Sequence, residues 1–317
     1  MTESTFCPVC SHPAVIQYKA LKDRLYFARP KADYYACSNS KCRHVFAWPT
    51  PNRDQIPALY ETYSTHAPVA LLRKNSKSRL IDLSVALFGL VDDLHGQIRR
   101  WRLMDMANRR GAILDVGCGA GNLLVALRAD GYDDLTGIDF DPKAVQVAQA
   151  AGLNVQAGEV SDVDRRDFDV VLMNHVIEHL PDPEQALVDV FARLKSGGVL
   201  IIRTPNSGSY LANFFGSDWR GLEPPRHLHI FSVESMELMA RKAGFRPIDV
   251  GTTNAMIQGI YLESVDLRLQ SMSGLRRRLM RLILRASFPI FVLAASIRRS
   301  SNGTSGEEVY AVLQMEV

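Results

Sequence analysis

Short apolar segments alternate with amphipathic segments over residues 111–317. The apolar segments are rich in aliphatic and β-branched residues and predict strands; they cover residues 112–116, 135–139, 154–157, 168–173, 199–203, 246–251 and 308–316. The amphipathic segments repeat apolar positions at helical spacing and predict helices over residues 122–129, 143–150, 183–194 and 233–243. This alternation is typical of an α/β fold, in which a parallel sheet carries helices on both faces.

The rest of the chain divides into two amino-terminal parts and an insertion. Residues 1–50 lack helical periodicity and are rich in cysteine, aromatic and turn residues, whereas residues 51–110 predict a helical linker or cap. A long segment at about 252–306 separates the last two predicted strands and predicts a helical insertion. Glycines are expected to end three of the predicted helices. They are Gly152, the pair Gly197 and Gly198, and Gly244.

Composition limits the class of protein only weakly. The 317 residues carry a net charge of +3, with 47% hydrophobic and 22% charged residues. This is an ordinary globular composition, and the charge is too near neutral to indicate nucleic acid binding by itself. The length fits one large domain with a small module. The sequence shows no uncharged apolar run of about 18 residues and no secretory signal at its start, so we expect a cytoplasmic protein.

A glycine-rich turn joins the first strand of the predicted sheet to its first helix. Gly117, Gly119 and Gly121 leave backbone N–H groups able to face a ligand at the start of that helix. Their spacing, G-x-G-x-G, differs from the G-x-G-x-x-G of dinucleotide sites and favours a ligand without a pyrophosphate. Asp139 ends the second strand, where a carboxylate is placed to accept both hydroxyls of a ribose.

Four segments carry a resemblance to a known family. They are LDVGCGAG at 114–121, GIDFDP at 137–142, FDVVLMNHVIEHLPDP at 168–183 and LKSGGVLIIRTPN at 194–206. They resemble the motifs of class I S-adenosylmethionine-dependent methyltransferases. The resemblance implies a seven-stranded Rossmann-like sheet whose last strand is antiparallel, which suits the late segment at 308–316. It also implies S-adenosylmethionine as the cofactor.

The same resemblance implies a role for each residue of the cofactor site. The three glycines wrap the methionine part, Asp115 orients it from below, and Asp139 binds the ribose with Phe140 beside the adenine. Cys118, inside the turn, is expected to be a small packed residue rather than a catalytic thiol. Further residues line the adenine and sulfonium ends, namely Glu159, Val160 and Asn174.

A group of histidines follows the fourth predicted strand, and another lies far along the chain. His175, Glu178 and His179 share one face if their segment is helical, and His227 and His229 form the distant pair. Three uses stay open. His175, His179 or His227 acts as a general base or substrate contact with Glu178 beside it; the group binds a divalent metal together with His227 or His229; or it only shapes the pocket. The layout resembles the metal site of small-RNA 2′-O-methyltransferases, with His175 in place of their first glutamate.

The segment at 219–232 resembles a loop in a methyltransferase subgroup of bacterial surface-glycan and small-molecule biosynthesis. Its aromatic and charged residues are expected to form a lid over the acceptor. Ser232 is the expected N-cap of the helix that follows. A full capping box needs Glu or Gln three residues later, and Ser235 stands there. The sequence therefore predicts an incomplete box.

Four of the five cysteines lie in the first 42 residues, as two knuckles. Cys7 and Cys10 form the first knuckle, and Cys37 and Cys42 form the second, with His12 and His44 as possible substitutes. Four thiolates close a tetrahedral Zn²⁺ site with no open position, so the expected site is structural. Members of the resembling subgroup often carry such a zinc ribbon before the catalytic domain.

The predicted insertion is basic and apolar. Between Asp266 and Glu307 there is no acid and there are eight arginines, and aliphatic residues fill much of 279–297. A basic amphipathic helix pair over 275–299 is suited to peripheral contact with an anionic membrane surface, such as an inner membrane face. A helical cap over the substrate site and a homodimer contact are the alternatives.

These features together predict an S-adenosylmethionine-dependent methyltransferase with a structural zinc ribbon. The favoured reaction is O-methylation of a sugar, a glycan intermediate or a lipid-linked small molecule. The alternatives are an RNA methyltransferase and a non-catalytic, cofactor-binding scaffold. The RNA alternative is disfavoured because the basic residues lie among aliphatic rather than aromatic side chains.

Overall fold

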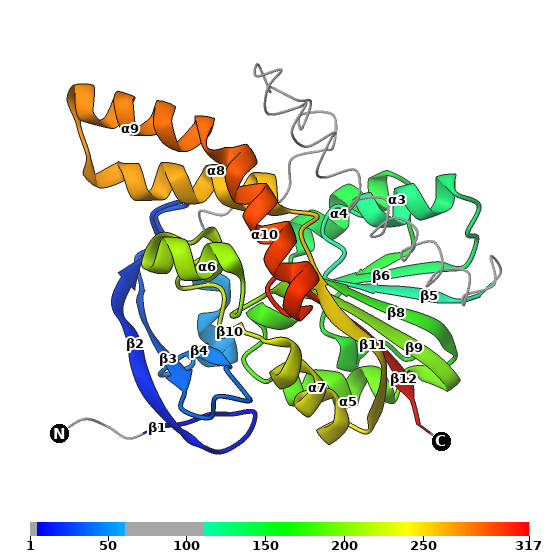
Figure 1. Cartoon of the computed structure of the whole chain (residues 1–317). Coiled ribbons are helices and arrows are strands. Elements are labelled where there is room, and N and C mark those ends of the chain that lie inside the picture. The colour runs from blue at the N-terminus through cyan, green and yellow to red at the C-terminus, as the bar shows by residue number, and fades with distance from the viewer. Residues whose placement is uncertain (1–4, 61–110, 317) are drawn as a thin grey trace.

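A seven-stranded sheet forms the larger part of the computed structural model, which describes residues 5–60 and 111–316 (Figure 1). The strand order is β11-β12-β9-β8-β5-β6-β7. Within this sheet β12 alone runs opposite to the other six strands. The strands are β5 (Ile113–Val116), β6 (Leu135–Asp139), β7 (Val155–Ala157), β8 (Phe168–Asn174), β9 (Leu194–Pro205), β11 (Phe245–Thr253) and β12 (Glu308–Met315). The predicted fold class, with its antiparallel last strand, is confirmed.

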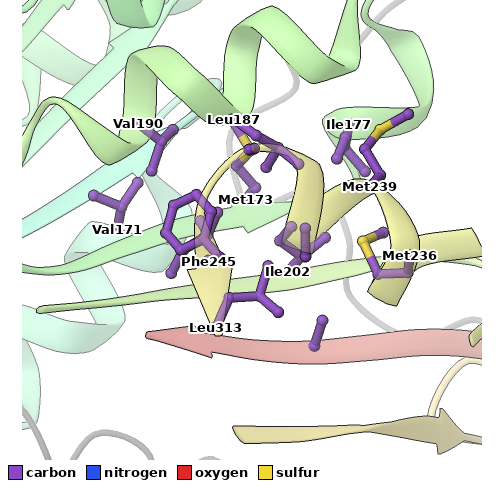
Figure 2. Close-up of a cluster of buried hydrophobic side chains, with 14 of the residues drawn as sticks. Val171, Met173, Ile177, Leu187, Val190, Ile202, Met236, Met239, Phe245 and Leu313 are labelled. Atoms are coloured by element: carbon purple, nitrogen blue, oxygen red, sulfur yellow. The ribbon is translucent and has the colours of Figure 1, made fainter. Parts of the chain in front are cut away.

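Helices cover both faces of this sheet, because alternate side chains of each central strand point to opposite sides. On one face α5 (Pro183–Phe191) and α7 (Val233–Lys242) pack on the strands. Figure 2 shows this core; its labelled side chains include Val171, Met173, Leu187, Val190, Ile202, Met236, Met239 and Leu313. On the other face α3 (Asn122–Ala129) and α4 (Pro142–Ala150) contribute Leu124, Leu127, Val145 and Ala148. Both faces of the central strands are therefore buried under helices.

A second, antiparallel sheet takes in the amino-terminal part, in the order β1-β2-β3-β4-β10. Its strands are β1 (Thr5–Phe6), β2 (Pro13–Lys22), β3 (Lys31–Cys37), β4 (Val45–Ala47) and β10 (His229–Ile230). The fifth strand, β10, comes from the segment predicted to be a lid. The amino-terminal sheet is thus completed by residues far along the chain.

The predicted insertion is helical and packs on the amino-terminal sheet. It contains α8 (Ile257–Arg268), α9 (Gly274–Ala286) and α10 (Phe288–Asn302), and α6 (Tyr210–Phe215) lies against α8 and α10. A shared core includes Tyr34 of β3, Phe215 of α6, Tyr261 of α8 and Phe288 of α10. Among the described residues no single helix is long and apolar enough to span a bilayer, although α9 and α10, bent by 46°, reach that length and composition as a pair.

One prediction from the sequence is wrong, and another falls largely outside the described residues. Gly197 and Gly198 do not close a helix: α5 ends at Phe191 and both glycines lie inside β9, where the register with β8 shifts between Phe168 and Val170. The glycines serve this bulge, and Gly197 has a φ of +76°. The predicted helices of 51–110 fall largely outside the described residues; the described part holds two 3₁₀ turns, Arg53–Gln55 and Pro57–Leu59.

Candidate functional site

The glycine turn lies at the carboxyl end of β5, where ligands bind in sheets of this kind. Gly117, Gly119 and Gly121 have φ values of +67°, +53° and +80°, which strain any residue with a side chain. A Cβ at Gly117 would lie 2.5 Å from Val176, and one at Gly121 would lie 2.1 Å from Leu153. A Cβ at Gly119 meets no atom within 4 Å. The outer glycines therefore permit packing, and the central one faces open space.

Two buried aspartates lie beneath this turn. The backbone N–H of Gly119 donates to Asp139 Oδ2 at 2.7 Å, and that of Asp141 donates to Asp139 Oδ1 at 2.9 Å. Burial, together with the charge of Asp139, raises the pKa of Asp115 to about 7. Burial also raises the pKa of the Cys118 thiol, so this side chain is a packed group and not a thiolate nucleophile.

The segment from Arg53 to Tyr60, with its two 3₁₀ turns, forms one wall beside the glycine turn. The exposed ring of Phe140 meets Tyr60 edge-on, with centroids 5.1 Å apart. Glu159 pairs with Arg53 of the same wall at 3.1 Å. The remaining predicted cofactor residues are the buried Val160 and the exposed Asn174 at the end of β8.

His175 forms an ionic group with two buried glutamates. Its Nδ1 lies 3.2 Å from Glu178 and its Nε2 lies 2.8 Å from Glu308. Burial acts to lower the pKa of His175, but the two carboxylates outweigh it and raise the pKa to about 10. Burial likewise opposes ionisation of Glu178, yet His175 holds the pKa of that carboxyl at about 2. His175 is therefore a cation that positions Glu178, and it has no lone pair for use as a base near neutral pH.

His175→Asn should lower the free energy of unfolding by about 2 kcal/mol, because two buried carboxylates lose their shared cation while a side chain that is 34% exposed admits some water. Asparagine tolerates the φ of +56° at this position, so backbone strain is not the cause. Urea titration measures the change. The control is Lys195→Gln, which breaks the exposed ion pair with Asp169 and should change stability by less than about 1 kcal/mol. Equal losses in the two variants would contradict this role.

His179 and His227 meet edge-on, with ring centroids 4.6 Å apart. His179 Nδ1 lies 2.9 Å from the hydroxyl of Tyr60 and 3.2 Å from the carbonyl of Arg226, and His227 Nδ1 lies 2.7 Å from the carbonyl of Gly221. Since a carbonyl oxygen only accepts, both Nδ1 atoms carry a proton, and these contacts do not involve either Nε2 atom. Burial lowers the pKa of His227 to about 4 and keeps it neutral.

The histidines do not assemble as the sequence predicted. Residues 177–179 form a 3₁₀ turn rather than an α-helix, so His175 and His179 point to different neighbours. The group whose possible ligand atoms lie within 4.8 Å of one another is Glu178, His179 and His227. His229 lies elsewhere: its Nδ1 is 3.1 Å from His44 Nε2, and the two rings stack. Of the two distant histidines that the sequence left open, His227 joins Glu178 and His179, whereas His229 and His175 lie outside this group.

The segment at 219–232 is a fixed wall held by buried charges. Arg226 is fully buried, with its guanidinium 2.7 Å from Asp23 and 2.9 Å from Glu223 and stacked over Tyr26. Ser232 caps α7 as predicted, but the capping box is complete. The hydroxyl of Ser235 accepts from the Ser232 N–H in place of a Glu carboxylate, since a hydroxyl is also an acceptor.

The four amino-terminal cysteines come together as the knuckle spacing predicts. Their sulfur atoms lie within 4.8 Å of one another, with Cys7 and Cys42 3.8 Å apart and Cys10 and Cys37 3.3 Å apart. All four are free thiols. The donor set fits a tetrahedral zinc ion. The possible substitutes have other contacts: His12 bonds the carbonyl of Cys10, and His44 pairs with His229.

Sequence reasoning missed Tyr60 and Glu308. Glu308 begins the antiparallel strand β12, so it lies at the edge where the parallel strands end; the predicted direction of that strand was the available signal. Tyr60 is the last described residue before the gap at 61–110, and no pattern in the sequence connects it with His179. Contacts of this kind depend on how separate elements pack.

Comparison with known proteins finds one family model and a set of relatives. The model described as a methyltransferase domain matches residues 93–250. The ubiquinone biosynthesis O-methyltransferase of Thiobacillus denitrificans is 31% identical over 181 residues, which cover 52% of this chain and 78% of that relative. The enzyme of the same name from Bordetella avium is 31% identical over 150 residues, which cover 43% of this chain and 62% of the relative, less than two thirds of its length.

Solved structures also match at low sequence identity. A SAM-dependent methyltransferase from Archaeoglobus fulgidus is 16% identical, with a TM-score of 0.47 over 75% of this chain and 100% of that chain.

Proposed function

Because the chain belongs to the S-adenosylmethionine-dependent methyltransferases, we propose that it transfers a methyl group from S-adenosylmethionine to a hydroxyl of a small-molecule acceptor. The relatives are named as O-methyltransferases, which supports oxygen as the methylated atom. The observation that carries the proposal is the position of His179: its Nδ1 is held by the Tyr60 hydroxyl and the Arg226 carbonyl, and Tyr60 connects it with Phe140 at the cofactor side.

The proposed cofactor cradle consists of the glycine turn and the residues around it. S-adenosylmethionine supplies an electrophilic methyl group when bound. The open face of Gly119 gives the ligand access to the backbone, and Asp139 offers its carboxylate to ribose hydroxyls. The other proposed contacts are Asp115, Gly117, Cys118, Gly121, Phe140, Glu159, Val160 and Asn174.

His179 is the proposed general base. Tyr60 and the Arg226 carbonyl fix its ring through Nδ1, so Nε2 can receive the proton of the acceptor hydroxyl as the methyl group leaves sulfur. His227 and Glu178 shape the floor beside it, and His175 holds Glu178 in place. The proposed acceptors are sugars, glycan intermediates and lipid-linked small molecules with a free hydroxyl.

The acceptor can be found by incubating the protein with methyl-labelled S-adenosylmethionine and a native metabolite and lipid extract, then identifying the labelled product. With that acceptor, His179→Asn should lower kcat by about 10²- to 10⁴-fold, and Tyr60→Phe by a smaller factor because only one of the two Nδ1 contacts is lost. The affinity for S-adenosylmethionine should stay unchanged in both variants.

Metal analysis separates this role from metal binding by the same group. If the full chain carries one divalent ion beyond the cysteine site, and both His179→Asn and His227→Asn remove it, these residues are ligands and the base assignment is wrong. A kcat for His179→Asn equal to that of the unaltered chain would reject both roles.

We also propose that Cys7, Cys10, Cys37 and Cys42 hold a structural zinc ion, which places the chain in the subgroup with an amino-terminal zinc ribbon. The convergence of four free thiols supports this proposal. All four cysteines belong to the amino-terminal sheet and its loops, so the ion would stabilise the sheet that anchors Arg226 and His229.

A further inference from the structure

One stripe of exposed aliphatic residues runs along α9 and continues along α10. Its members follow one another at intervals of four, three, four, four, three and four residues, which keeps them on one side of a helix. They are Leu275, Leu279, Leu282, Ala286, Ile290, Leu293 and Ile297, and all are exposed. α9 lies at the outer edge of the molecule, away from the large sheet, and α10 runs back from it toward that sheet (Figure 1).

This stripe is separate from the face that the fold uses. Leu284, Phe288, Val292 and Ala295 are the buried positions of the same two helices, and they pack into the core shared with α6 and α8. In contrast, Leu275, Leu282 and Ile290 are 80%, 68% and 69% exposed. A contiguous apolar surface of this kind on a folded protein indicates an interaction site.

The charged residues of α9 and α10 themselves are all arginines. Residues 267–306 contain eight arginines and no acid. Arg281 and Arg285 pair with Asp266 of α8 at 3.1 Å and 3.4 Å. Arg276 and Arg278 are exposed, and within the described part of the chain no ion pair is recorded for either. Cations therefore flank the aliphatic surface and remain available to an anionic partner.

We propose that the stripe on α9 and α10 docks on an anionic lipid surface. An aliphatic stripe flanked by arginines matches the boundary between acyl chains and anionic headgroups. A second copy of this chain is a poorer partner, because a symmetric contact would bring the same arginines of both copies together. The surface is built like that of an interfacial helix.

The insertion that carries the stripe joins the large sheet at the same edge as the candidate site. The insertion leaves the sheet after Thr253 of β11 and returns at Glu308 of β12, and Glu308 contacts His175. The insertion therefore joins the sheet at the edge that carries the carboxyl ends of the parallel strands. The inference concerns binding alone and does not depend on the proposed reaction.

Vesicle flotation of the full chain tests this inference. The protein should float with phosphatidylcholine vesicles that contain phosphatidylglycerol, should float poorly with phosphatidylcholine alone, and should be released by salt. The double variant Leu282→Glu with Ile290→Glu should lower partitioning at least about a hundredfold, because two aliphatic side chains no longer enter the lipid. Arg276→Gln with Arg278→Gln should lower it about thirtyfold.

The matched control places the same new charges on another surface. Val188 of α5 and Leu238 of α7 are also exposed aliphatic residues on helices, at 43% and 41%. Val188→Glu with Leu238→Glu should float like the unaltered chain. Unchanged affinity for S-adenosylmethionine in every variant would show that the fold is intact and would keep this test separate from that of the proposed reaction.

Three results would overturn the inference. The protein does not float with anionic vesicles, or the stripe variants float as well as the control. Alternatively, sedimentation shows a dimer that Leu282→Glu with Ile290→Glu dissociates, which would assign the stripe to a second copy of the chain.

Discussion

Gly119→Ala is expected to weaken binding of S-adenosylmethionine by about tenfold to a hundredfold. The new methyl group enters a space where no protein atom lies within 4 Å, so it meets the ligand rather than the fold. The change also strains the φ of +53°, which costs about 1–2 kcal/mol of folding free energy. Calorimetric titration with S-adenosylmethionine and with its demethylated product measures the loss of affinity.

Gly197→Ala is the matched control, because it carries the same strain without the cradle. Gly197 has a φ of +76°, and its Cβ also meets nothing within 4 Å. It lies in the bulge at the start of β9, opposite the carboxyl ends of the parallel strands. Both variants should lose similar stability, and only Gly119→Ala should lose affinity. Equal affinities in the two variants would show that the turn does not face the cofactor.

Cys42→Ser, or treatment with a strong chelator, is expected to unfold the amino-terminal sheet. A structural zinc ion contributes about 10–16 kcal/mol to folding of small zinc modules, and this sheet joins only a few strands around the cysteine cluster. The loss should spread, because the Ser232 hydroxyl donates to the carbonyl of Cys42 and Arg226 pairs with Asp23. Thermal unfolding with and without chelator, followed by circular dichroism, measures the effect.

Cys118→Ser provides the comparison for zinc. Cys118 is the fifth cysteine and is also buried, but it lies in the glycine turn and outside the cysteine cluster. Its replacement should leave the metal content at one zinc per chain and leave the chelator sensitivity intact. A protein without zinc whose unfolding does not respond to chelator would show that the four thiols are structural without metal.

The variants Gly119→Ala and Cys42→Ser change two regions, the glycine turn and the cysteine cluster, that belong to one connected fold. The amino-terminal sheet supplies Asp23 to the charge group around Arg226, and the carbonyl of Arg226 holds His179. Loss of the zinc site is therefore expected to disturb the proposed base from a distance, whereas Gly119→Ala acts at the cradle. Comparison of the two variants shows whether acceptor chemistry and cofactor binding depend on separate parts of the chain.

Local patterns made several features predictable from the sequence. The glycine turn, the position of Asp139 and the N-cap at Ser232 depend on residues that are close together in the chain, so spacing alone specifies them. Gly197 and Gly198 misled the prediction for α5, because a glycine that ends a helix and a glycine in a bulge look alike in sequence. The capping box was underestimated because a serine hydroxyl took the place of a carboxylate.

By itself the sequence determined the α/β class, the antiparallel last strand, the glycine turn with its acid and the spacing of the four cysteines, because periodicity and short-range geometry encode these features. Only the tertiary structure decided which histidine meets which partner. His179 reaches Tyr60 across 119 residues, and His44 reaches His229 across 185. Such pairs depend on how elements that are far apart in the chain pair and pack, and no local pattern in the sequence specifies this.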